Sequence, residues 1–286
     1  MKHFSLLSFA DQEHRGILSR PGILNRIAPV FLHPRPKKDL HIKGLGLTGT
    51  QLMIPMGTGN WQSLSDRNKI SMAAKARQVA LDKLETPNIL VSRGGTEQEL
   101  MEPGDRNGDY FVSALTSKLA GHWLEKADAK RVIVAGDDTL TAVAALLIAD
   151  RYRIPVIWQS LHPEKHEVTV SRALYRHGIP ISLMPFDPAG WKKTDLALNL
   201  HEYYAQMGAR YGSGCKVDLS NSSSGHAPEL ENELSEQGIN PSLAYLSPVL
   251  EWVLLDDRDT TGLSEWEIVH DAEQKGDAVW DYFLDN

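Results

Sequence analysis

The stretch RVIVAGDDTLTAVAALLIADRYRIPVIWQS, residues 131–160, decides the fold of this chain. It starts with a short apolar run, turns at Gly136, and continues in an apolar helical pattern from Thr139 to Tyr152. A second apolar run, IPVIWQS, follows at once. Two short apolar runs separated by a helix-length segment predict neighbouring parallel strands, because a parallel connection needs a crossover of this kind.

The same alternation extends in both directions from this stretch. The apolar runs that predict further strands are HFSLLSF, IAPVFLH, HIKGLGLTGTQLMIPM, NILVS and IPISLMPF. Helical spacing predicts helices over residues 65–85, YFVSALTSKLAGHWLEKA, EVTVSRALYRHG and WKKTDLALNLHEYYAQMG. Gly178 is placed as a helix C-cap, and Ser264 with Glu267 forms the pattern of a capping box. Strands that alternate with helices predict an α/β fold with a doubly wound, mostly parallel sheet.

Changes in pattern predict three parts of the chain. We expect an N-terminal α/β domain over residues 1–108 and a second domain with the parallel sheet over 109–215. Residues 216–286 contain polar stretches and amphipathic helical patterns, and we expect them to form a C-terminal helical extension.

Composition and charge limit the partners. The chain has 286 residues, 42% of them apolar, and a net charge of −7, which provides no general footprint for nucleic acid or an anionic membrane. No apolar run is long enough for a membrane span, and the N-terminus lacks the pattern of a signal peptide. Its single cysteine, Cys215, excludes an internal disulfide. We therefore expect a cytoplasmic protein with a small-molecule substrate and no nucleic-acid or membrane partner; a homodimer is left open.

The loop Gly136-Asp137-Asp138-Thr139-Leu140-Thr141 follows the strand RVIVA. Dinucleotide-binding folds usually carry G-x-G-x-x-G here, because glycine lets the backbone approach a pyrophosphate at the helix N-terminus. This loop retains the first glycine and then has two aspartates. Carboxylates suit a helix N-terminus as caps, whereas a carboxylate about 4 Å from a phosphate costs roughly 4 kcal/mol at an effective dielectric of about 20.

Four interpretations of these aspartates remain open. They could cap the helix with no ligand, bind a ribose or sugar hydroxyl, act as a general base, or pair with a cationic ligand or metal. We expect Asp137 to contact a polar ligand and Asp138 to cap the helix.

The order of the patterns resembles the two-domain dehydrogenase superfamily that includes shikimate dehydrogenase and the long-chain acyl-carrier-protein reductases. The resemblance covers roughly residues 41–185. It joins an N-terminal α/β part containing GLTGTQLMIPM and NILVSRGGT, a linking helix YFVSALTSKLAGHWL, and a Rossmann-like part, RVIVAGDDTLTAVAALLIADRY. It implies a Rossmann-like sheet and a nucleotide cofactor, NAD(P). Apart from this resemblance, S-adenosylmethionine (SAM) is a second candidate cofactor for an enzyme of Rossmann type.

A shorter resemblance concerns GDDTLTAVAALLIADRYRIPV, residues 136–156. It is similar to the G-D-T-x-T run, apolar helix and I-P-V of the non-hydrolysing UDP-N-acetylglucosamine 2-epimerases. In that family the aspartate acts in acid-base chemistry, and the resemblance implies this role for Asp137.

Other candidate site residues follow from the loops at the carboxyl ends of the expected strands, where open α/β sheets bind ligands. Arg93 with the neighbouring glycines could form an anion-binding loop, and His162 could act in acid-base catalysis, as could His166. We expect no metal site. The catalytic candidates are Asp137 and His162; the cofactor-binding candidates are Arg93, Gly94, Gly95, Thr96, Gly136, Asp138, Thr139, Thr141 and Gln159.

The sequence therefore favours a small-molecule enzyme of Rossmann type, dehydrogenase-like or dependent on another nucleotide cofactor, with an altered phosphate loop. Two alternatives stay open. One is a non-catalytic ligand-binding or sensor protein with the same fold, and the other is an enzyme resembling a sugar-nucleotide epimerase that uses Asp137.

Overall fold

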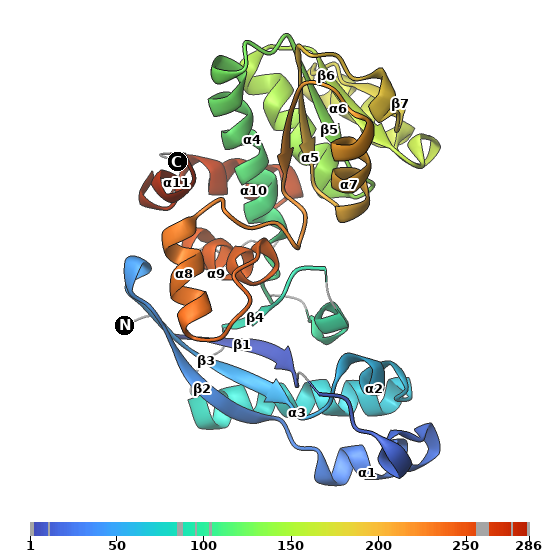
Figure 1. Cartoon of the computed structure of the whole chain (residues 1–286), viewed down its shortest axis with the longest axis vertical. Coiled ribbons are helices and arrows are strands. Elements are labelled where there is room, and N and C mark those ends of the chain that lie inside the picture. The colour runs from blue at the N-terminus through green and yellow to red at the C-terminus, as the bar shows by residue number, and fades with distance from the viewer. Residues whose placement is uncertain are drawn as a thin grey trace. The chain divides into compact units, whose positions relative to one another are not determined.

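The computed structural model describes residues 3–10, 12–84, 88–94, 96–102, 105–255, 263–275 and 277–284. The chain divides into two compact units, each discontinuous in sequence (Figure 1). Unit 1 comprises Met1–Asn107 and Glu229–Trp252, and unit 2 comprises Gly108–Pro228 and Val253–Asn286. Residues 216–286 are shared between the two units.

Unit 1 contains a four-stranded sheet in the order β2-β3-β1-β4. Strand β1 runs parallel to β3 and β4, and β2 runs antiparallel to β3. The strands are β1 (His3–Phe9), β2 (Arg35–Ile42), β3 (Leu47–Ile54) and β4 (Ile89–Val91). The accompanying helices are α1 (Pro21–Phe31), α2 (Thr58–Gln62), α3 (Asp66–Leu84), α8 (Pro228–Glu236) and α9 (Leu243–Leu255).

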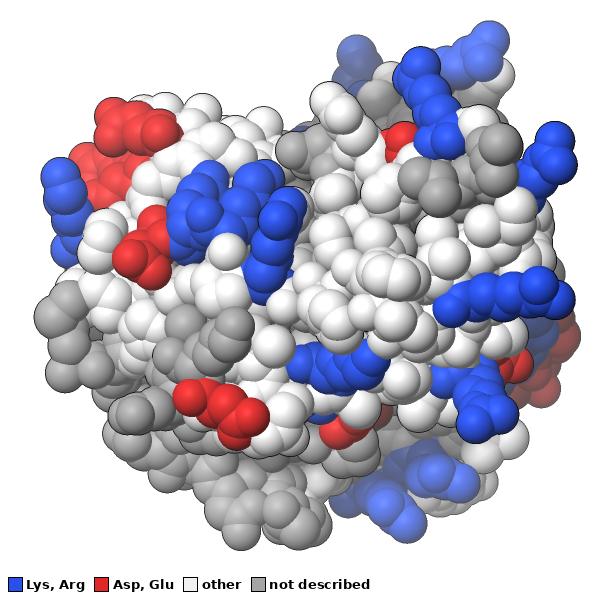
Figure 2. Space-filling view, turned by 90° about the horizontal axis from the view of Figure 1, so that it is seen from below, with Lys and Arg blue, Asp and Glu red and all other residues white. Residues whose placement is uncertain are grey.

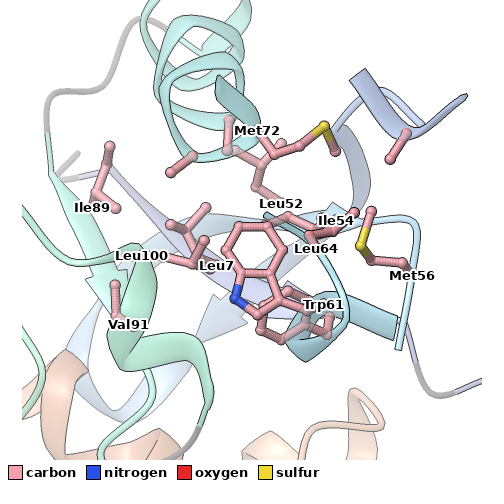
Figure 3. Packing of buried hydrophobic residues seen from close by; sticks show 14 of the residues in the cluster. Leu7, Leu52, Ile54, Met56, Trp61, Leu64, Met72, Ile89, Val91 and Leu100 are labelled. Atoms are coloured by element: carbon pink, nitrogen blue, oxygen red, sulfur yellow. The ribbon is translucent and has the colours of Figure 1, made fainter. Parts of the chain in front are cut away.

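The core of unit 1 lies between its sheet and helices α1 and α3. Leu52 and Met72 pack around Trp61, and all three side chains are fully buried (Figure 3). The indole Nε1 of Trp61 donates a hydrogen bond to Glu99 Oε2 at 3.0 Å. Trp61 is therefore a structural core residue.

The run IAPVFLH, which we expected to be a strand, lies mostly in helix α1. The helix starts at Pro21, and it buries Leu24 and Ala28, which are one helical turn apart. A short apolar run can belong to a buried strand or to one face of a helix, so its periodicity alone did not distinguish the two.

Unit 2 contains a fully parallel five-stranded sheet in the order β7-β6-β5-β8-β9. Its strands are β5 (Arg131–Ala135), β6 (Val156–Ser160), β7 (Ser182–Pro185), β8 (Asp195–Asn199) and β9 (Cys215–Asp218). The predicted parallel pairing of RVIVA with IPVIW is confirmed, with Val132 opposite Val156. The first strand lies in the middle and the order reverses between β5 and β8, which is the Rossmann arrangement.

One expected helix of unit 2 is wrong. Residues 191–208 contain strand β8 before helix α7 (Glu202–Tyr211) begins. All five residues of β8 are buried, so the strand lacks the polar alternation that would distinguish it from a buried helix. The other helices of unit 2 are α4 (Asp109–Lys126), α5 (Thr139–Tyr152), α6 (Glu167–His177), α10 (Glu265–Gln274) and α11 (Asp277–Leu284).

The C-terminal helices α10 and α11 complete the core of unit 2. The predicted capping box of Ser264 and Glu267 is present at the start of α10. Farther along α10, Glu273 is buried and accepts a hydrogen bond from Ser117 Oγ of α4 at 2.8 Å. On α11, Trp280 stacks on Phe111 of α4 with ring centroids 5.3 Å apart.

The surface in Figure 2 carries lysine and arginine side chains in separate groups among uncharged residues. In the part of the chain that the structure describes, no helix has both the length and the apolar content of a membrane span.

Candidate active site

The candidate site of unit 2 lies where β5, β6 and β8 end. These three parallel strands lead into the loop at residues 136–138, the segment 161–166 and the pair Leu200-His201. The sheet order reverses between β5 and β8. Open α/β sheets usually bind ligands in a crevice at the carboxyl ends of the strands on either side of such a point.

Asp138 caps helix α5, as expected. Its Oδ1 accepts a hydrogen bond from the backbone N–H of Thr141 at 2.7 Å and another from the Thr141 hydroxyl. Its Oδ2 lies 3.2 Å from His201 Nε2. Burial alone would raise the pKa of Asp138, but His201 and the two groups of Thr141 lower it well below the ordinary 3.8. The helix N-terminus is therefore neutralised by an ionised carboxylate of the chain itself.

Gly136 makes the close turn before these aspartates possible. A Cβ at this position would lie 2.4 Å from Thr141 Oγ1 and 2.9 Å from His201 Cδ2. The Gly136 carbonyl accepts a hydrogen bond from Trp158 Nε1 at 2.8 Å. The glycine therefore serves the packing of the loop against the start of α5 and against His201.

Asp137 is held by donors from β6 and α7. Its carboxylate accepts hydrogen bonds from the hydroxyls of Ser160 and Tyr204 and from the backbone N–H of Leu161, the last at 3.1 Å. Burial raises the pKa of Asp137, but these donors and the backbone N–H of His162 lower it below its ordinary value. About a third of the side chain, 31%, remains exposed. Asp137 is therefore an oriented, ionised acceptor that a ligand can reach.

The histidine next to Asp137 is His166, whereas the expected catalytic residue was His162. His166 packs on Trp158 with ring centroids 4.4 Å apart, and its Nε2 lies 3.9 Å from Asp137 Oδ1. That nitrogen is buried and has no hydrogen-bond partner among the described residues. The ring of His162 is more than half exposed and faces Glu164, with Nδ1 3.6 Å from Oε1. The expectation weighed both histidines, and the structure brings His166 to the aspartate.

Three other cofactor-binding candidates of unit 2 differ in their surroundings. Gln159 is buried, and its Oε1 accepts hydrogen bonds from Trp191 Nε1 at 2.9 Å and from the backbone N–H of Asp187. Thr141 is buried and donates to Asp138. Thr139 is the exposed first residue of α5. Of these three, only Thr139 has a side chain open to solvent.

The remaining candidates, Arg93, Gly94 and Thr96, lie in unit 1. Arg93 is buried at the end of β4, and its backbone N–H donates to the Ala244 carbonyl at 2.8 Å. Gly94 has a φ of +71°, and Thr96 starts a short 3-10 helix. Gly95 falls outside the described residues. That this loop and residues 136–141 serve one ligand stays a prediction.

Sequence reasoning missed two members of the cluster, His201 and Tyr204. Both follow β8, which we expected to be part of a helix, so nothing pointed to a strand end there. The run DLALNL directly before His201 is mostly apolar, as a buried parallel strand is, but a run of this length also fits a segment of a buried helix.

No group of three or more His, Cys, Asp or Glu side chains within the described ranges is arranged to hold a metal ion. The acidic run Asp256-Asp257-Arg258-Asp259, which the sequence offers as a charged surface turn, lies outside those ranges.

Comparison with known proteins finds neither a family model nor a curated protein that matches the chain. Among solved structures, the chain is similar to L-tryptophan dehydrogenase from Nostoc punctiforme, with 11% identity over 99% of this chain and 80% of that one and a TM-score of 0.43. Hetero-hexameric glutamate dehydrogenase from Thermus thermophilus gives 16% identity, coverages of 98% and 74%, and a TM-score of 0.41. Shikimate 5-dehydrogenase from Thermus thermophilus gives 11% identity, coverages of 96% and 99%, and a TM-score of 0.35. At these values the likeness is a distant one of fold.

Proposed function

We propose that the protein is a small-molecule enzyme of Rossmann type whose crevice in unit 2 takes a nucleotide-derived cofactor without a diphosphate at residues 136–141. SAM fits this description, since it has ribose hydroxyls and a sulfonium cation and no phosphate. NAD(P) would have to place its pyrophosphate away from this loop.

The observation that carries the proposal is the cap that Asp138 makes on α5. A phosphate at a helix N-terminus binds the free backbone N–H groups there, and Asp138 already takes that of Thr141. Two ionised carboxylates would also repel a phosphate by several kcal/mol at contact distance, on the order of 4 kcal/mol per pair. The pKa of Glu265 at the start of α10 is raised by burial and by the charge of Asp138, so the negative charge of Asp138 also acts on this neighbouring helix.

Asp137 has the features of a residue that binds such a cofactor. Its carboxylate is fixed by Ser160 and Tyr204 and is partly exposed, which suits it to accept hydrogen bonds from a ribose or sugar diol or to attract a cation. A carboxylate whose pKa is lowered is a weak general base at neutral pH. We therefore assign Asp137 to ligand binding, and His166, with its buried unpartnered Nε2, to proton transfer.

The test is calorimetric titration of the full chain with SAM, S-adenosylhomocysteine, NADP⁺ and UDP-N-acetylglucosamine. We expect saturable binding of SAM or S-adenosylhomocysteine and a gain of about 2.7 kcal/mol in stability at 100 times the dissociation constant. Asp137→Asn should weaken this binding at least tenfold. Asp187→Asn, which changes an aspartate at a short 3-10 turn of the same unit, serves as the matched control.

Two results would count against the proposal. Binding of NADP⁺ by the unaltered chain with no effect of SAM would show that the loop accepts a diphosphate cofactor. Absence of binding by all four compounds would favour the non-catalytic alternative, in which the aspartates only hold the loops together.

A further inference from the structure

A cavity of unit 2 lies at the opposite edge of the sheet from residues 136–141. It has a volume of about 570 Å³ and is formed where β5, β6 and β7 begin. Its apolar wall includes Ile154, Ile157, Ile179 and Ile181, and the charged residues at it are Arg131 and Arg153. Cavities of 300–1,000 Å³ with mostly apolar walls and a few polar groups are typical ligand sites.

Two similar loops build this wall. Arg153 caps the C-terminus of helix α5 and is followed by Ile154-Pro155-Val156, and Gly178 caps the C-terminus of helix α6 and is followed by Ile179-Pro180-Ile181. In each loop the proline fixes its own φ and restricts the isoleucine before it. The backbone at Ile154 and Ile179 is thus restricted before any ligand arrives.

The two loops differ in the residue that caps the preceding helix. Both caps adopt the left-handed conformation, with φ +66° at Gly178 and φ +52° at Arg153. Glycine takes this conformation without steric cost, whereas an arginine is disfavoured there. The chain therefore has a long cation at the cavity, at a position where the equivalent loop uses glycine.

The two arginines at the cavity differ in their availability. Arg131 forms a two-pronged ion pair with the buried Asp195, with Nε 3.0 Å from Oδ1. Arg153 is 81% exposed, and its guanidinium lies 3.4 Å from Asp150 Oδ1, itself 42% exposed. An exposed ion pair of this kind contributes little to stability, and its arginine can readily take another anionic partner. The Arg153 guanidinium can therefore turn to an anion bound at the cavity.

We propose that this cavity binds an amphipathic carboxylate, with its apolar chain against the four isoleucines and its carboxylate on the guanidinium of Arg153. The site is separate from the crevice of the proposed function, and its ligand is of a different class. An aliphatic acid matches the apolar wall and the single available cation, because arginine binds carboxylates in a paired hydrogen-bond geometry.

The probe is decanoate, with decan-1-ol as the uncharged compound of the same chain length. Both are titrated into the ¹⁵N-labelled full chain, with calorimetry for the dissociation constants and amide shifts for the position of binding. We expect decanoate to bind more tightly than decan-1-ol and to shift the amides of Ile154, Ile157 and Ile181.

The decisive variant is Arg153→Gly, which removes the guanidinium and suits the left-handed backbone. It should bind decanoate at least tenfold more weakly and leave decan-1-ol unaffected, because one charged hydrogen-bonding partner is lost. Asp128→Gly is the matched control, since Asp128 also has a positive φ, of +45°, and is not among the residues of the cavity. It should leave both affinities unchanged.

The proposal is overturned if decanoate binds the Arg153→Gly variant as tightly as the unaltered chain, if it binds no more tightly than decan-1-ol, or if it does not bind. Shifts confined to residues away from the cavity would overturn it as well. Ile154→Gln gives an independent check, because loss of apolar wall should weaken both compounds together.

Discussion

His201 Nε2 lies 3.2 Å from Asp138 Oδ2, and the other oxygen of the same carboxylate caps helix α5. One side chain thus connects the start of α5 to the residue that precedes α7. These two residues follow β5 and β8, which stand on either side of the point where the sheet order reverses, so their contact joins the two loops at that point.

Acid should weaken unit 2 in part through Asp138. The pKa of its carboxyl lies below the ordinary 3.8, since His201 and Thr141 stabilise the charged form more than burial disfavours it. A carboxyl with a lowered pKa contributes stability that is present above its unfolded value and is lost as pH falls through its folded value. Asp138→Asn should therefore be less stable than the unaltered chain at pH 7, by up to about 1 kcal/mol. The deficit should shrink below about pH 4. Urea denaturation at a series of pH values measures it, and a deficit independent of pH would contradict this account.

Gly136→Ala should destabilise unit 2 by about 1–3 kcal/mol, because the new methyl group would overlap Thr141 and His201. Thermal denaturation checks the loss. Gly22→Ala is the control: Gly22 is in helix α1, and no atom lies within 4 Å of the place that its new methyl group would take, so this change should be neutral or slightly stabilising. Equal stability of the two variants would show that the loop can move aside.

The stability of helix α10 should depend on the buried carboxylate of Glu273. Glu273 pairs with Arg151 of α5 at 2.5 Å and accepts a hydrogen bond from Ser117 of α4. Glu273→Gln should cost about 2 kcal/mol, since it removes a charged hydrogen-bonding partner from a buried position. Hydrogen exchange should become faster across Glu265–Gln274. Ser117→Ala, which leaves the ion pair in place, should have a smaller effect, and unchanged exchange in Glu273→Gln would refute the dependence.

The thiol of Cys215 should react slowly with alkylating reagents at pH 8. Burial raises its pKa, although Lys126 and Lys216 act in the opposite direction, and the thiolate is the reactive form. Because the chain has a single cysteine, the rate of iodoacetamide labelling reports on this residue alone. The same chain in urea should react faster; a native rate equal to the denatured rate would contradict the expectation.

Much of unit 2 could be predicted from local pattern. The strand pair β5 and β6, helix α5, its cap at Asp138 and the glycine cap at Gly178 all follow from residues close together in sequence. Strand β8 could not be distinguished from a helix, because a strand buried on both faces has no polar alternation.

The candidate site was predicted only in part, and for the same reason. Asp137 stands out because it directly follows an apolar strand, whereas Tyr204 reaches it from a helix 67 residues farther along the chain. The spacing of His162 and His166 in the sequence could not show which of them lies next to Asp137. The ring of His166 packs on Trp158, and the ring of His162 faces Glu164. Such contacts are products of tertiary packing.

The division of the chain into two discontinuous units has a consequence for its synthesis. Unit 1 contains Met1–Asn107, yet its other segment, Glu229–Trp252, is made after most of unit 2. Phe4 of β1 packs on Trp252, with ring centroids 5.5 Å apart, so this core contact forms only after a partner nearly 250 positions later has been made. All four strands of the unit 1 sheet are thus translated before helices α8 and α9, and a chain that stops before Trp252 lacks a segment of each unit.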